Sequence, residues 1–123
     1  MTQIRTLIVD DSAIMRKLLR KALAGAGVDD GLILEAGNGA EALEVLKTKD
    51  VDLLFTDINM PVMNGIALLA ELATFERWQN LTRVIISTDG SACRDSKVDA
   101  YLEKPFSPDA ITAVLAKALQ KAA

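Results

Sequence analysis

Short apolar runs alternate with helix-like segments along this chain of 123 residues, and the alternation restricts the possible folds. Each run is rich in Ile, Leu and Val and bounded by polar residues, which is typical of strands covered on both faces. Strands that alternate with helices over short connections predict a doubly wound parallel sheet with right-handed crossovers. We expect one α/β domain spanning residues 1–123, with strands within residues 6–10, 32–36, 51–57, 83–87 and 100–104.

Helix signals stand between the predicted strands. Ser12 and Ser107 are candidate N-caps, Pro108 suits a first helical position, and Gly25 to Gly27 predict a helix end. The remaining helices are expected over residues 40–47 and 65–75. Apolar positions at helical spacing predict core-facing stripes, which comprise Ile14, Met15, Leu18, Leu19, Ala22 and Leu23; Ile66, Leu68, Leu69 and Leu72; and Ile111, Val114, Leu115, Ala118 and Leu119.

The fourth crossover is short. Only twelve residues, 88–99, separate the fourth and fifth predicted strands. Because a parallel crossover needs about a dozen residues at minimum, we expect a shortened fourth helix or a loop there.

Composition excludes several function classes. A net charge of −3 and a pI of about 4.9 argue against a nucleic-acid-binding surface. No apolar stretch approaches the roughly 18 residues of a membrane span, so no membrane insertion is expected. Cys93 is the single cysteine, which favours a reducing, cytoplasmic location. The absence of histidine excludes Ser-His and Cys-His nucleophile pairs and a role as histidine phosphodonor.

Polar side chains follow four of the predicted strands, namely Asp10 with Asp11, Asp57, Ser87 and Lys104. The carboxyl ends of parallel strands lie along one edge, so these groups converge if their strands are near neighbours. Three clustered carboxylates repel unless a cation intervenes, and Mg²⁺ prefers oxygen ligands while keeping several waters. Asp57 could then form an acyl phosphate, with Lys104 and the Ser87 hydroxyl stabilising the phosphoryl charge. Taken singly, each acid could equally be a turn or capping residue.

Four segments together resemble the receiver domain of bacterial response regulators. They are Val9-Asp-Asp-Ser12, Thr56-Asp-Ile-Asn-Met-Pro-Val-Met-Asn-Gly65, Ile86-Ser87 and Tyr101-Leu-Glu-Lys-Pro-Phe106. The likeness covers nearly the whole chain and is strongest to stand-alone, CheY-like receivers of the chemotaxis type. It implies a flavodoxin-like sheet with strand order 2-1-3-4-5 and no output domain.

The resemblance also implies roles for individual residues. Asp57 would be the phosphoacceptor and Lys104 would contact the phosphoryl group. Asp10, Asp11, Asp57 and the backbone carbonyl of Asn59 would hold Mg²⁺ or Mn²⁺. Ser87, Thr88 and Tyr101 would form the switch, although Thr88 stands where the family prefers a smaller residue.

A sensor histidine kinase would then be the phosphodonor, and a downstream protein, with a phosphatase as one candidate, would be the target. The chain itself would be a signalling protein, monomeric or weakly dimeric, that catalyses only its own phosphorylation and dephosphorylation.

Three alternatives stay open from the sequence. Residues 37–42 fit the G-x-G-x-x-A dinucleotide fingerprint, with Asp57 twenty residues beyond Gly37. An aspartyl phosphohydrolase is a second alternative, although Asn59 stands where such an enzyme needs an acid. The third is a receiver-like module that binds a partner without phosphorylation, which the short fourth crossover favours.

Overall fold

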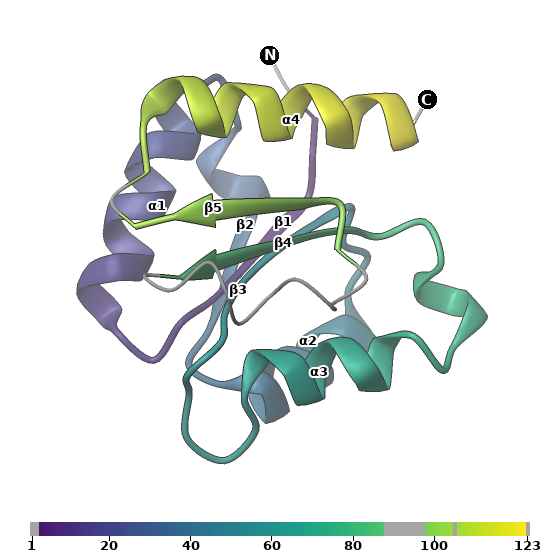
Figure 1. Cartoon of the computed structure of the whole chain (residues 1–123). Coiled ribbons are helices and arrows are strands. Elements are labelled where there is room, and N and C mark those ends of the chain that lie inside the picture. The colour runs from purple at the N-terminus through teal and green to yellow at the C-terminus, as the bar shows by residue number, and fades with distance from the viewer. Residues whose placement is uncertain (1–2, 88–97, 105, 123) are drawn as a thin grey trace.

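The computed structural model describes residues 3–87, 98–104 and 106–122, and its sheet has the predicted order β2-β1-β3-β4-β5 (Figure 1). Each neighbouring pair of strands is parallel. The strands are β1 (Thr6–Val9), β2 (Ile33–Ala36), β3 (Leu53–Asp57), β4 (Thr82–Ser87) and β5 (Ala100–Glu103). The prediction of a flavodoxin-like parallel sheet is confirmed.

Helices cover both faces of this sheet, as Figure 1 shows. One core lies under α1 and α4 and includes Phe55, whereas the other lies under α2 and α3 and includes its neighbour Leu54. Consecutive strand residues point to opposite faces, so a strand buried on both sides must be apolar throughout. The helices are α1 (Ala13–Gly25), α2 (Gly39–Thr48), α3 (Gly65–Leu72) and α4 (Pro108–Ala122), with short 3₁₀ turns η1 (Asp30–Leu32) and η2 (Glu76–Trp78).

Side-chain caps fix where the helices begin. The Ser12, Asn38 and Asn64 side chains accept the backbone N–H groups of Met15, Glu41 and Ala67, respectively. The predicted cap Ser107 likewise accepts the N–H of Ala110 at the start of α4. Each cap satisfies a donor that the first helical turn leaves without a backbone partner. Helix starts are therefore held close to the strand ends that precede them.

Two details of the helix predictions are wrong. Four residues that were expected to face the core are substantially exposed, and α3 ends at Leu72 rather than near Phe75. A helix on a sheet buries only a narrow strip, which Leu19 and Leu23 occupy in α1. The exposed four are Ile14 (75%), Leu18 (51%), Ile66 (38%) and Leu119 (46%).

Residue Phe75 lies beyond the end of α3 and makes a different contact. Its ring packs edge-on against Trp78 of η2, with 5.2 Å between the ring centroids.

The shortened fourth helix expected between β4 and β5, together with Thr88, falls outside the described residues. In the part of the chain that is described, none of the helices has the length and apolar character needed to cross a bilayer.

Candidate functional site

The strand register brings the predicted polar residues to one edge of the sheet. Val9 pairs with Thr56, and Asp57 pairs with Ile86. Asp10 therefore follows β1 beside the end of β3, and Ser87 ends β4 one residue beyond the partner of Asp57. The backbone N–H of Lys104, just after β5, donates to the Ser87 carbonyl at 2.9 Å. The predicted convergence at the carboxyl edge is confirmed for these positions.

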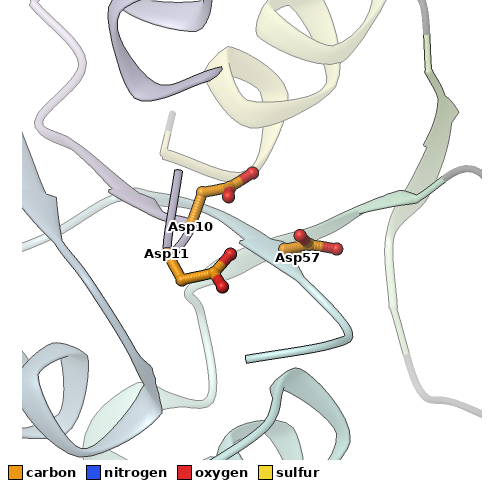
Figure 2. Close-up of side chains that lie close together, drawn as sticks. All are labelled: Asp10, Asp11 and Asp57. Carbon is orange, nitrogen blue, oxygen red and sulfur yellow. The ribbon is translucent and has the colours of Figure 1, made fainter. Parts of the chain in front are cut away.

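Three carboxylates form the centre of this edge. Figure 2 shows Asp10 and Asp11 at the end of β1 beside Asp57 at the end of β3. One carboxylate oxygen from each residue lies within 4.8 Å of the others. Asp10 is buried, at 4% exposure, whereas Asp11 is exposed and Asp57 is half-buried. The cluster thus concentrates negative charge while leaving one side open to solvent.

Lys104 supplies positive charge to this cluster. Its Nζ donates to Oδ2 of Asp10 at 3.2 Å and to Oδ2 of Asp57 at 3.3 Å. Burial acts to lower the pKa of Lys104, but the charges of Asp10 and Asp57 outweigh it, so the pKa is raised. The ammonium group therefore stays protonated at neutral pH between the two carboxylates.

The Asp10 carboxyl has a raised pKa. Burial is the main cause, and the nearby charge of Asp57 adds to it, while the Ser12 N–H and Lys104 act in the opposite direction. The Ser12 N–H donates to Oδ1 at 2.9 Å. The raised pKa of Asp10 means that one lysine does not fully compensate the buried negative charge.

This donor set suits a hard divalent cation. Carboxylate oxygens are the ligands that Mg²⁺ prefers, and Mg²⁺ sites commonly use one or two carboxylates with waters completing the shell. Three carboxylates against one lysine leave net negative charge for a cation to neutralise. Asn59, whose backbone carbonyl was predicted as a further ligand, lies in the exposed loop directly after Asp57. The acidic cluster can therefore hold a metal ion.

Two of the three predicted switch residues, Ser87 and Tyr101, contact each other. Ser87 is buried, at 3% exposure, and its backbone carbonyl accepts the Tyr101 hydroxyl at 3.3 Å. The Tyr101 ring is partly buried against the core that lies under α2 and α3. Ser87 and Tyr101 are thus physically linked, whereas Thr88 falls outside the described part of the chain.

The loop after Asp57 depends on two glycines whose packing role the sequence did not reveal. A Cβ on Gly65 would lie 2.1 Å from the backbone oxygen of Asp57, and a Cβ on Gly39 would lie 2.7 Å from that of Met63. The Gly65 N–H donates to the Ile58 carbonyl at 2.9 Å, and the Gly39 N–H donates to Met63 at 2.9 Å. An Asn-Gly pair such as Asn64-Gly65 indicates a turn, but it gives no sign of this close approach.

The same contact disfavours the dinucleotide alternative. In such a fingerprint the glycine turn leaves backbone N–H groups free to approach a pyrophosphate. Here the Gly39 N–H is used by the Met63 carbonyl, and the Gly37 N–H donates to the Glu41 side chain at 3.1 Å. The backbone N–H groups of Gly37 and Gly39 are therefore both hydrogen-bonded within the protein, so they are not free to bind a pyrophosphate.

Arg16 of α1 also contacts the site, which the sequence analysis did not anticipate. Its Nη1 donates to the backbone carbonyl of Asp10, and its Nε donates to Glu35 on β2 at 2.9 Å. Helical periodicity gives no signal for this contact, because it depends on how α1 lies against the ends of β1 and β2.

Comparison with known proteins identifies this arrangement. Residues 6–116 match the response regulator receiver domain family. A chemotaxis protein CheY homolog from Campylobacter jejuni is 34% identical over 113 residues, which cover 87% of this chain and 85% of that protein. The solved structure of the chemotaxis response regulator CheY4 of Vibrio cholerae has a TM-score of 0.78 at 27% identity, covering 99% of this chain and 100% of that chain.

A third comparison concerns the metal. The receiver domain of sensor histidine kinase PA1611 from Pseudomonas aeruginosa has been solved with a magnesium ion coordinated in its active site cleft. It has a TM-score of 0.85 and covers 97% of this chain and 99% of that chain. At 18% identity this likeness shows a shared fold only.

Proposed function

The chain belongs to the response regulator receiver domain family, as a CheY-like receiver of two-component systems, and from this we propose that Asp57 accepts a phosphoryl group in a Mg²⁺- or Mn²⁺-dependent reaction. The observation that carries the proposal is the Lys104 ammonium group between Asp10 and Asp57, 3.2 and 3.3 Å from their Oδ2 atoms. A carboxylate nucleophile beside a fixed cation and two further acids is the arrangement that acyl phosphate formation requires.

Each residue of the cluster has a distinct task in this reaction. Asp10, Asp11, Asp57 and the Asn59 carbonyl would hold the cation, which supplies charge neutralisation on the phosphoryl oxygens. An Asp57 carboxylate oxygen forms the new bond to phosphorus as the bond from phosphorus to the donor nitrogen breaks, and the leaving imidazole takes up a proton. Lys104 moves from its carboxylate partners to the transferred phosphoryl group, where its charge stabilises the equatorial oxygens.

The added phosphoryl charge then changes the neighbouring strand end. The Ser87 hydroxyl turns toward the phosphoryl group, and Thr88 follows it in sequence. Because the Tyr101 hydroxyl already donates to the Ser87 carbonyl at 3.3 Å, a shift at Ser87 alters the packing of the Tyr101 ring. Phosphorylation would thereby bias a two-state surface beside β5.

This chain has no histidine, so a phosphohistidine donor would have to be a separate protein. We propose a sensor histidine kinase as the donor and a downstream protein as the target, both in the cytoplasm. The chain would catalyse its own phosphorylation and hydrolysis and no other turnover.

The proposal is tested by incubation with acetyl phosphate and Mg²⁺, followed by intact mass measurement. One phosphoryl adduct is expected for the wild type, and none for Asp57→Asn or in EDTA. Asp52→Asn is the matched control, because Asp52 lies just before β3 at the opposite end of the same strand and pairs with Arg5. This variant should still form the adduct.

Two results would overturn the proposal. An adduct that persists in Asp57→Asn would place the acceptor elsewhere. No adduct, and no beryllofluoride binding, would favour the receiver-like module that acts without phosphorylation, which the twelve-residue fourth crossover suggests as the second candidate.

A further inference from the structure

We propose that Arg16 is a positioning residue for the metal site, which orients the Asp10 and Asp11 carboxylates by fixing the peptide group between them. The inference rests on the proposed function, because it concerns the same divalent cation. Arg16 extends from α1 toward the strand ends, and its guanidinium group joins the Asp10 carbonyl to the Glu35 carboxylate.

The Asp10 carbonyl belongs to the peptide group that links Asp10 to Asp11. A peptide group is planar, so fixing its oxygen also fixes the direction in which the chain leaves Asp10. Both side chains that flank this plane are members of the acidic cluster. A rotation of the plane would change the spacing of the Asp10 and Asp11 carboxylates.

Among the described residues, other contacts fix the remaining groups of Asp10 but do not involve this carbonyl. The Asp10 N–H donates to the Ala36 carbonyl at 3.2 Å, which continues the pairing between β1 and β2. The Asp10 carboxylate accepts the Ser12 N–H at one oxygen and Lys104 at the other. β1 ends at Val9, so the Asp10 carbonyl lies beyond the strand, where Arg16 donates to it.

Arg16 is itself held by a series of ion pairs that links α1 to β2 and η1. Glu35 accepts Arg16 at one carboxylate oxygen and Arg20 at the other, both at 2.9 Å. Arg20 in turn donates to Asp30 at 2.6 Å and to the Ile33 carbonyl at 3.0 Å. Arg16 and Arg20 are largely buried, with side-chain exposures of 20% and 28%. A guanidinium group held at both ends of its planar fork has little freedom to release the Asp10 carbonyl.

A positioning role and a purely electrostatic role for Arg16 predict different Mg²⁺ affinities when this residue is replaced. If Arg16 acted only through its charge, it would repel the cation, so Arg16→Gln would bind Mg²⁺ more tightly and Arg16→Lys would match the wild type. If Arg16 positions the peptide group, both variants lose the two-ended contact and both bind Mg²⁺ more weakly. Outer-shell partners of metal ligands typically affect metal affinity by 10- to 100-fold.

The test is the Kd for Mg²⁺ by isothermal titration calorimetry, without any phosphodonor. We expect Arg16→Gln and Arg16→Lys each to weaken binding about tenfold, and Glu35→Gln to weaken it less, because Arg16 remains. The matched control is Arg5→Gln, which removes a similar arginine–carboxylate pair, with Asp52, from the other end of β1. This control should leave the Kd unchanged.

A metal-free measurement separates positioning from loss of fold. The backbone amide of Asp11 shares the peptide group that Arg16 contacts, so its ¹⁵N–¹H resonance should shift in Arg16→Lys and stay in place in Arg5→Gln. Wild-type Mg²⁺ affinity in folded Arg16→Lys and Arg16→Gln would overturn the inference alone. A wild type that fails to bind Mg²⁺ would overturn the proposed function and this inference with it.

Discussion

The Nζ atom of Lys104 lies 3.3 Å from Oδ2 of Asp57, although the two residues are 47 positions apart in the chain. The pair joins the ends of β3 and β5, which are separated in the sheet by β4. A lysine in this position compensates part of the negative charge of the acidic cluster, and under the proposed function it would also contact the phosphoryl group. Stability and cation binding are therefore coupled through the same few atoms.

Replacing Lys104 should make the protein more dependent on a divalent cation. We expect Lys104→Met to lower the metal-free unfolding free energy by about 3 kcal/mol, because Asp10 and Asp57 lose a largely buried partner. Mg²⁺ should then stabilise this variant more than the wild type, since the cation neutralises the same carboxylates. Urea unfolding in EDTA and in Mg²⁺ measures both effects, with exposed Lys17→Met as the control. If Mg²⁺ raised the unfolding free energy of the variant and of the wild type by the same amount, the prediction would be contradicted.

The pH dependence of stability should report on Glu35. Burial acts to raise the pKa of Glu35, but hydrogen bonds from Arg20 and Arg16 outweigh it, so the folded-state pKa is lowered. A carboxyl whose pKa is lowered on folding contributes stability above its unfolded pKa, and this contribution is lost as pH falls through the folded pKa.

Glu35→Gln should therefore be less stable than the wild type by about 1 kcal/mol at pH 7. The difference should begin to shrink as pH falls through the ordinary glutamate pKa of about 4.3 and should be lost below the lowered pKa of the folded state. Urea unfolding from pH 7 to pH 3 measures the difference. Glu44→Gln is the control, because Glu44 is 75% exposed and its ion pair with Lys47 is long at 3.9 Å, so this variant should have nearly the stability of the wild type at pH 7. If the difference in unfolding free energy between Glu35→Gln and the wild type stayed constant from pH 7 to pH 3, the lowered pKa of Glu35 would be refuted.

Gly65 should not tolerate a side chain. A Cβ at this position would meet the Asp57 backbone oxygen at 2.1 Å, so Gly65→Ala must displace the chain beside Asp57, the proposed phosphoacceptor. We expect a loss of about 3 kcal/mol in unfolding free energy and slower phosphorylation by acetyl phosphate. Gly25→Ala is the matched control, because nothing lies within 4 Å of its added Cβ. It should be neutral or stabilising, and similar losses in both variants would argue against the close approach.

Val62 occupies a strained turn in the loop after Asp57. Its φ is 68°, and the Met63 N–H donates to the Pro61 carbonyl at 2.7 Å, which together form a γ-turn of the rare type. A β-branched residue is disfavoured there, whereas glycine is not. Val62→Gly should raise the unfolding free energy by about 1 kcal/mol, the relieved strain less the entropy cost of glycine.

Thermal and urea unfolding check this prediction, and Val45→Gly provides the comparison. Val45 lies within α2, so glycine should destabilise that position by about 1 kcal/mol. If Val62→Gly is destabilised to the same degree as Val45→Gly, the positive φ of Val62 carries no strain.

Local sequence patterns were sufficient to predict the strands of the sheet and many of the residues of the candidate site. The apolar runs that end in Asp57 and Ser87 indicated strands covered on both faces, and the helices predicted between successive strands indicated that the strands are parallel. Parallel strands place their carboxyl ends along one edge, so the meeting of Asp10, Asp57 and Lys104 was predictable. The strand order came from the family resemblance, and the observed sheet confirms it.

The sequence by itself determined which residues could carry the chemistry, because strand periodicity and turn residues act over a few neighbouring positions. Only the tertiary structure decided how those residues are held. Ile14 and Leu18 are exposed because the sheet covers one narrow strip of α1. Arg16 reaches the Asp10 carbonyl because α1, which packs on one face of the sheet, places this residue beside Asp10 and Glu35. Such contacts join residues on different elements, and they depend on packing geometry that no local pattern encodes.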